Sequence, residues 1–124
     1  MPLYNFKKRF ADDVESGKKL QTIRRRRKRP TVAGEMLHLY TGLRTKVSRL
    51  LRRALCTRVL PVEVHWHGVK VGPEWIAEEE KDAFARADGF ADYEDFHRFW
   101  RKEHCMTEEN PLTGFDLIQW EPKT

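Results

Sequence analysis

A run of six basic residues, from Arg24 to Arg29, limits the fold of this chain more than any other feature of its sequence. Charged side chains are almost never fully buried unless they are paired, and no acidic residue lies near this run in sequence. The run therefore cannot enter a core, and we expect a solvent-exposed basic loop at residues 24–30, ended by Pro30. Short alternating segments at residues 20–24 and 36–40 are predicted as the strands on either side of it.

The remaining segments predict both helices and strands. Phe6, Phe10 and Val14 recur at helical spacing and predict an amphipathic helix that stops at Gly17. Residues 43–53 hold five basic residues, and we expect an irregular insert with one helical turn. The other expected elements are strands within 54–67 and at 69–71 joined by a hairpin at Gly68, helices at 76–86 and from about residue 91, and a last strand at 115–120.

This order of elements predicts an α+β fold. The 124 residues fit a single domain over residues 1–124, and 40% hydrophobic residues are enough for one core. We expect a small β-barrel of about five or six strands, with one N-terminal helix and two further helices before the last strand.

The charge is divided unevenly along the chain. Residues 1–60 carry a net charge of +13, and residues 61–124 carry −8. A basic face would attract polyanions, whereas interleaved halves would only pair their charges. An acidic half that docks a protein partner is a further alternative.

Several features indicate a cytoplasmic protein with no membrane partner. The start of the chain, from Met1 to Arg9, runs from apolar to basic, which is the reverse of a secretion signal. No stretch approaches the ~18 apolar residues of a membrane span. Cys56 and Cys105 are too few for a disulfide framework.

A candidate for chemistry follows the first predicted helix. Thr22 and Arg24 lie two apart in a predicted strand and so share a face, and Lys19 precedes them. A threonine hydroxyl needs a base to become a nucleophile, and a lysine can serve when burial or nearby cations lower its pKa. Arg24 would hold a phosphate or carbonyl, or stabilise an oxyanion. The alternative is a surface lysine, a threonine chosen for strand propensity and a solvated arginine.

The other polar and aromatic candidates are weaker. The basic run would bind phosphates by counterion release, and Tyr40, Trp66 and Trp75 would offer stacking surfaces for bases or else pack in the core. The histidines and cysteines do not have the compact spacing of a four-ligand zinc site. We therefore expect no metal and no cofactor.

Three blocks of the sequence together resemble the ASCH family. They are Phe10-x-Asp12-x-Val14-x-x-Gly17-x-Lys19-x-x-Thr22-Ile23-Arg24 with Gly34-Glu35-Met36-Leu37 and Tyr40-Thr41-Gly42, then Ala87-Asp88-Gly89-Phe90 with Phe96-x-x-Phe99-Trp100, and finally Ile118-Gln119-Trp120. The resemblance covers nearly the whole chain. It implies a PUA-like barrel with a cleft suited to RNA or a nucleoside.

The resemblance also implies an activity, because short bacterial members of the family include an enzyme that removes the acetyl group from acetylated cytidine. The lysine, threonine and arginine of its pattern match Lys19, Thr22 and Arg24, and its later glutamate falls on Asp88, which is one methylene shorter. The implied roles are a base for Lys19, a nucleophile for Thr22, and a proton carrier or orienter of Lys19 for Asp88. We expect substrate to be bound by Arg24, Arg25, Arg26 and Tyr40.

Three functions follow as hypotheses. The first is an amidohydrolase that acts on acylated cytidine. The second is an RNA-binding module without chemistry, and the third is a ribonuclease that uses the same basic cleft. The basic loop and the insert at 43–53 differ from the compact enzyme, and they would enlarge the ligand from a nucleoside to RNA.

Overall fold

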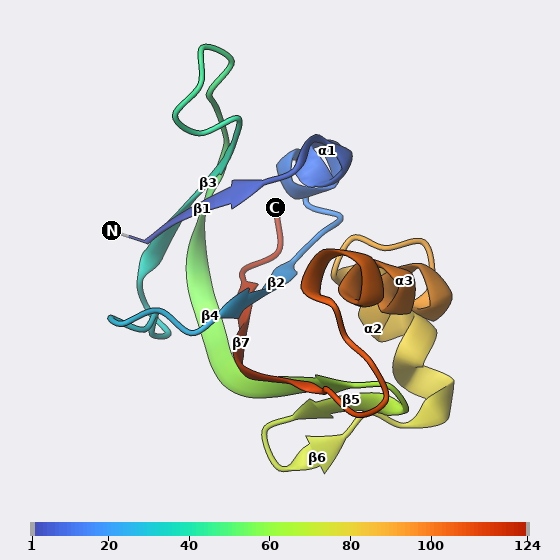
Figure 1. Cartoon of the computed structure of the whole chain (residues 1–124). Coiled ribbons are helices and arrows are strands. Elements are labelled where there is room, and N and C mark those ends of the chain that lie inside the picture. The colour runs from blue at the N-terminus through green and yellow to red at the C-terminus, as the bar shows by residue number, and fades with distance from the viewer. Residues whose placement is uncertain (1, 124) are drawn as a thin grey trace.

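The computed structural model describes residues 2–123, which form a bent seven-stranded sheet with three α-helices (Figure 1). This confirms the α+β class. In chain order the elements are β1 (Leu3–Phe6), α1 (Lys8–Ser16), β2 (Gln21–Arg25), β3 (Met36–Thr41), β4 (Arg49–His65), β5 (Gly68–Val71), β6 (Glu74–Trp75), the 3-10 helix η1 (Glu78–Glu80), α2 (Lys81–Ala87), α3 (Tyr93–His104) and β7 (Leu112–Trp120).

The long strand β4 organises the sheet. Its first part pairs antiparallel with β3, its second part pairs with β7, and its end pairs with β5. The strand curves strongly between these partners (Figure 1). β1 runs parallel to β3, and β2 runs antiparallel to β7. Within residues 2–123 neither β1 nor β2 pairs with a second strand, so the sheet is open and has seven strands rather than five or six in a closed barrel.

Arginine side chains bridge the gap between the unpaired edges of β1 and β2, which we call the seam. Arg24 Nη2 donates a hydrogen bond to the carbonyl oxygen of Asn5 at 2.6 Å, and Arg27 Nη2 donates to the carbonyl oxygen of Leu3. The Arg27 guanidinium also lies 3.9 Å from the centre of the Tyr4 ring. Backbone acceptors on the edge of β1 are thus satisfied by side chains instead of a neighbouring strand.

The prediction that placed Phe6 on a helix was wrong. Phe6 is the last residue of β1, and α1 begins at Lys8. The strand has its own period of two, because Tyr4 and Phe6 are buried while Leu3 and Asn5 are exposed. Phe6 keeps helical spacing to Phe10 only because both side chains enter the same core.

The predicted irregular insert at 43–53 was also wrong in its second half. Residues 42–48 are irregular, but β4 already begins at Arg49. In this part of β4 Leu51 and Ala54 point into the core while Arg49 and Arg53 are exposed. The outward arginines hid the strand pattern, and the two-residue strand β6 was missed because it is too short to show a period. The predicted helix at 76–86 is shorter than expected, since it consists of η1 followed by α2.

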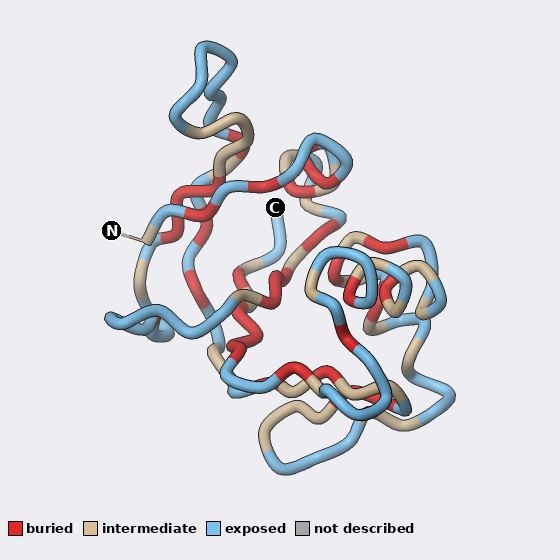
Figure 2. The backbone as a smooth tube through the Cα atoms, in the orientation of Figure 1, coloured by how far each residue is buried: buried red, intermediate tan, exposed pale blue. Residues whose placement is uncertain are grey.

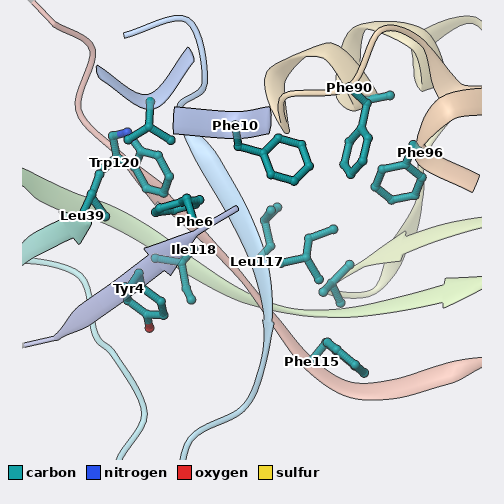
Figure 3. Close-up of a cluster of buried hydrophobic side chains, with 14 of the residues drawn as sticks. Tyr4, Phe6, Phe10, Leu39, Phe90, Phe96, Phe115, Leu117, Ile118 and Trp120 are labelled. Atoms are coloured by element: carbon teal, nitrogen blue, oxygen red, sulfur yellow. The ribbon is translucent and has the colours of Figure 1, made fainter. Parts of the chain in front are cut away.

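The buried hydrophobic residues form one cluster. The buried stretches of the backbone, red in Figure 2, lie on both the strands and the helices. Tyr4, Phe6 and Ile118 occupy the part near β1, and Phe90 and Phe96 occupy the part near α2 and α3 (Figure 3). The exposed segments in Figure 2 include residues 44–48 and residues 26–30. The prediction of an exposed basic loop at 24–30 was wrong at its start, because Arg24 and Arg25 belong to β2 and Arg24 is half-buried. Among residues 2–123, no helix has the length and apolar character that crossing a membrane requires.

Candidate active site

A cavity of about 320 Å³ lies between α1, β2 and the helices α2 and α3. Its walls are mainly aromatic, and Phe10 and Phe90 point toward each other there with ring centres 5.2 Å apart (Figure 3). The aromatic lining residues are Phe6, Phe10, Phe90, Phe99, Trp100 and Phe115. The cavity also contains the side chains of Lys19, Thr22, Arg24 and Asp88, which come from distant parts of the sequence.

Lys19 reaches the cavity from the turn between α1 and β2. Gly17 ends α1 in the left-handed region with φ +87°, and the Lys19 amide then donates to the Asp13 carbonyl at 2.9 Å. The next amide, of Leu20, donates to the carbonyl of Ala87 at 3.3 Å and ties this turn to the end of α2. The Lys19 side chain is only 3% exposed.

Asp88 receives the Lys19 ammonium group. It is the residue that follows α2, and Lys19 Nζ donates both to its backbone carbonyl and to its carboxylate, with 3.2 Å between Nζ and Oδ1. The Asp88 side chain is 4% exposed. A lysine next to the last carbonyl of a helix also satisfies a group that has no partner within the helix.

Gly89 permits this approach. Its φ is +93°, and a Cβ atom there would lie 2.9 Å from Phe10 Cδ1 and 3.0 Å from Lys19 Cδ. Only glycine fits both the backbone conformation and the space. The Asp88-Gly89-Phe90 sequence thus presents a carboxylate and an aromatic ring to one cavity across a closely packed turn.

Burial moves the pKa values of the lysine and the aspartate toward each other. Loss of water lowers the pKa of Lys19, and the Asp88 carboxylate only partly opposes this effect. Loss of water raises the pKa of Asp88 to about 6, although Lys19 and Arg24 favour its charged form. A proton therefore moves between the two groups at a lower free-energy cost than between the same groups in water.

Thr22 and Arg24 share one face of β2, as their spacing predicts. Arg24 Nε donates to Thr22 Oγ1 at 3.0 Å, and the guanidinium lies 4.8 Å from the centre of the Phe6 ring. The hydroxyl oxygen of Thr22 is thus held by a cation that favours a developing alkoxide. Of these described side chains, Lys19 and Thr22 are not joined directly by a hydrogen bond within 3.5 Å.

Of the other predicted substrate-binding residues, only Arg25 lines the cavity. Arg25 lines the cavity, is exposed, and lies 4.8 Å from the centre of the Phe115 ring. Arg26 is bound elsewhere, because its Nε and Nη2 donate to Asp116 Oδ1 at 3.0 and 2.8 Å. Tyr40 lies on β3 opposite Asn5 and Leu50, and it does not line the cavity. We therefore leave Arg26 and Tyr40 out of the site proposed below.

His104 and Lys7 line the cavity but were missed as site residues. The His104 ring stacks on Trp100 with ring centres 4.5 Å apart, and burial lowers its pKa. Lys7 lies 5.5 Å from the centre of the Phe99 ring and pairs with Glu103 at 3.0 Å. Trp100 and His104 are four residues apart on a helix, which placed them on one face, but the sequence had no signal that this face reaches the cavity of Lys19.

The histidines and acids are dispersed. Among residues 2–123 no three His, Cys, Asp or Glu side chains gather as candidate metal ligands. His65 and His67 instead face Glu63 and Glu108 at 2.9 and 3.2 Å.

Comparisons with family models, curated proteins and solved structures find no match for this chain. The geometry of the cavity and the resemblance of its motifs are the grounds for a functional proposal.

Proposed function

We propose that the protein hydrolyses the amide of an acylated cytidine in this cavity. One observation carries the proposal: a buried lysine and aspartate with opposed pKa shifts share an aromatic cavity with a threonine hydroxyl held by an arginine. Groups with perturbed pKa values in a concave site are typical of general acid and base chemistry. The resemblance to the ASCH family supports the same residues.

The reaction begins with the Thr22 hydroxyl. Lys19 in its neutral form takes the hydroxyl proton while Thr22 Oγ1 forms a bond to the acyl carbon, and Arg24 stabilises the resulting oxyanion. The C–N bond then breaks, and the Lys19 ammonium gives its proton to the departing exocyclic nitrogen of cytosine. Asp88 holds the lysine in place and takes up a proton when Lys19 is neutral. Hydrogen bonds of this kind are often long before substrate binds, which accounts for the missing direct contact between Lys19 and Thr22.

Water completes the cycle. A water molecule attacks the acyl ester on Thr22 while Lys19 takes one of its protons. The ester C–O bond breaks, Lys19 returns the proton to Thr22 Oγ1, and a carboxylic acid leaves. No redox partner is needed, because amide and ester hydrolysis leave every oxidation state unchanged.

The size and walls of the cavity favour a nucleoside. Ligand pockets usually have volumes of roughly 300–1,000 Å³, and this cavity of about 320 Å³ lies at the small end. Aromatic side chains stack on any planar base. Lys7 and Arg25 line the cavity and are exposed, so they offer charged groups to the polar substituents of a substrate.

The test is the release of cytidine from acetylcytidine, followed by chromatography. We expect Lys19→Ala to lower the rate roughly 100-fold or more, as loss of a general base does. Lys18→Ala is the matched control, because Lys18 is exposed and does not line the cavity. Thr22→Ser should retain activity that Thr22→Val loses. Absence of cytidine with the wild-type protein, or an undiminished rate in Lys19→Ala, would refute the proposal.

RNA binding without chemistry is the second candidate function. Its specific support is that Arg25, Arg27, Lys28 and Arg29 are exposed and lie more than 4 Å from every carboxylate among the described residues. Such binding should weaken with salt with a log–log slope near −0.7 for each phosphate contacted on a single strand. Changing these four residues to glutamine should reduce the slope, and a slope near zero in the wild type would rule against RNA binding. Degradation of the RNA during the assay would identify the ribonuclease alternative.

A further inference from the structure

We propose that a second pocket, on the outer side of the seam, binds a phosphate group attached to the nucleoside in the cavity. This inference rests on the proposed function, because it names the class of substrate: a phosphorylated cytidine rather than the free nucleoside. The phosphate belongs either to a free nucleotide or to an RNA chain, and the experiment below separates these sources.

The second pocket adjoins the cavity directly. It has a volume of about 430 Å³ and is lined by Leu3, Asn5, Arg24, Arg27, Leu43 and Arg44. Asn5 and Arg24 also line the cavity. The Arg24 side chain, which crosses the seam to the Asn5 carbonyl, is therefore a wall shared by both spaces. Thr22, which it contacts, lines the cavity, and Arg44 lines the second pocket. A group that projects from a nucleoside past Arg24 would enter the outer pocket.

The pocket has the chemistry of an anion site. Three of its six lining residues are arginines, and none is acidic. Among the described residues, no carboxylate lies within 4 Å of Arg24, Arg27 or Arg44, and only Arg24 is near enough to a carboxylate, that of Asp88, for their charges to shift each other's pKa values. The planar guanidinium group matches the geometry of phosphate oxygens and forms strong charge-assisted hydrogen bonds with them.

The arginines are held in place before any ligand binds. Arg27 is stacked on Tyr4 and bound to the Leu3 carbonyl, and Arg24 is bound to the Asn5 carbonyl. Asn5 Oδ1 accepts a hydrogen bond from the Leu43 amide at 2.9 Å, which fixes the loop at 42–48 beside the seam.

Arg44 itself has a φ of +68°, a left-handed conformation that a residue with a side chain rarely adopts. Such backbone strain is concentrated at functional sites, where the surrounding structure enforces it. Here it accompanies the placement of a third guanidinium group over the pocket.

Binding at equilibrium tests the inference without any turnover. Titration calorimetry would compare cytidine, cytidine 5′-monophosphate and a short oligocytidylate without terminal phosphates, because none of these carries a scissile amide. We expect the wild-type protein to bind the monophosphate at least tenfold more tightly than cytidine. Arg44→Ala should weaken monophosphate binding roughly three- to tenfold and leave cytidine binding unchanged, since one charged contact is lost.

Lys46→Ala is the matched control, because Lys46 is an exposed cation of the same loop that lines neither space. Added inorganic phosphate provides a test without mutation: it should weaken binding of the monophosphate but not of cytidine. Tighter binding of the oligocytidylate than of the monophosphate, with a steeper salt dependence, would assign the phosphate to RNA, and the reverse order would assign it to a free nucleotide.

Equal affinity of the wild type for cytidine and its monophosphate would overturn the inference, as would equal losses in Arg44→Ala and Lys46→Ala. Both results leave the hydrolysis of acylcytidine untouched. Conversely, failure of the hydrolysis assay together with a phosphate-dependent gain in affinity would remove the proposed reaction and retain the phosphate pocket.

Discussion

Lys19 and Asp88 depend on each other because both are almost completely removed from water. A buried charge without a partner is very unfavourable, whereas a close pair recovers part of the lost hydration energy. The ammonium also binds the Asp88 carbonyl, so it has two oxygen partners on one residue. Removal from water makes the pair reactive. It also means that loss of either side chain lowers the stability of the folded protein.

Lys19→Met should destabilise the protein strongly. The change leaves the Asp88 carboxylate without its counter-charge in a buried site, and breaking such a pair lowers the free energy of unfolding by about 3–5 kcal/mol. Lys19→Met together with Asp88→Asn should recover a large part of this loss, because no buried charge remains. Denaturant unfolding of the two single variants and the double variant measures the coupling, and strictly additive effects would contradict it.

The raised pKa of Asp88 predicts an unusual dependence of stability on pH. Its carboxyl titrates near 6 in the folded protein, against 3.8 for the ordinary side chain. Between these pH values the folded state binds more protons than the unfolded state, so the contribution of Asp88 to stability is full below pH 4 and falls as the pH rises to 6. A pKa shift of one unit corresponds to about 1.36 kcal/mol, so the shift from 3.8 to about 6 lowers the free energy of unfolding by about 3 kcal/mol.

Carboxylates whose pKa is lowered on folding change the stability with pH in the opposite direction. The contribution of Asp88 is therefore measured as a difference between two proteins. The double variant Lys19→Met with Asp88→Asn lacks both groups and is the reference at each pH. The unfolding free energy of the wild type minus that of the reference should decrease from pH 4 to pH 6. The lowered pKa of Lys19 acts with the opposite sign, because deprotonation of Lys19 as the pH rises stabilises the folded state. A difference that rises between pH 4 and 6 would show that Asp88 is an ordinary ionised partner.

At the scale of elements, the turn from α2 to α3 is the part that assembles the site. It carries Asp88, Gly89 and Phe90 to the turn between α1 and β2. Helix α3 then begins at Tyr93 with Asp92 as its N-cap, whose side chain accepts from the Asp95 amide. The two helices and the turn between them thereby form one wall of the cavity and hold it against the turn between α1 and β2.

Gly89→Ala should disrupt this wall. The new methyl group would lie 2.9 Å from Phe10 Cδ1 and 3.0 Å from Lys19 Cδ, in addition to the backbone strain at φ +93°. Gly34→Ala is a close control, because Gly34 has φ +95° and a methyl group added there would meet nothing within 4 Å. We expect Gly89→Ala to be less stable than Gly34→Ala by about 1–3 kcal/mol, as overpacking is. Equal unfolding free energies of the two variants would show that the packing tolerates a methyl group there.

Sequence patterns predicted most elements but not the ones that are short or highly charged. The periods of α1 and β3 were readable because apolar side chains mark one face. In β4 the residues from Arg49 to Arg53 carry arginines on the outer face, which resembles a solvated loop. β1 has four residues, and its partner β3 is more than thirty residues away, so its parallel pairing leaves no local signal.

The site shows the same limit. Thr22 and Arg24 could be placed on one face from strand geometry alone. The meeting of Lys19 with Asp88, 69 residues later, could not, because periodicity does not report on contacts between distant segments. Only the motif resemblance paired them.

At the scale of the whole molecule, the excess of positive charge is concentrated in the elements that flank the seam. Arg24 and Arg25 end β2, the basic residues 26–29 follow in the connection to β3, and the loop at 42–48 follows β3. Their mutual repulsion opposes a compact fold. Arg24 and Arg27 offset this by donating to the free carbonyls of β1, so the open edge of the sheet uses part of the charge that would otherwise only repel.

The seam should open when this bridge is removed. Arg27→Ala deletes the hydrogen bond to the Leu3 carbonyl and the stacking on Tyr4, which together contribute about 1 kcal/mol or slightly more at an exposed site. Local opening of β1 then becomes roughly five- to tenfold more frequent, and the amides of this strand exchange hydrogen faster by the same factor. The centre of β7, which pairs with both β2 and β4, should keep its exchange rate.

Arg29→Ala removes an equal charge from an exposed position of the same loop and serves as the control. Equal exchange rates of the β1 amides in both variants would mean that the loss of charge, rather than the loss of the bridge, determines how often the seam opens. A selective increase in Arg27→Ala would identify this arginine as the link that holds β1 against β2.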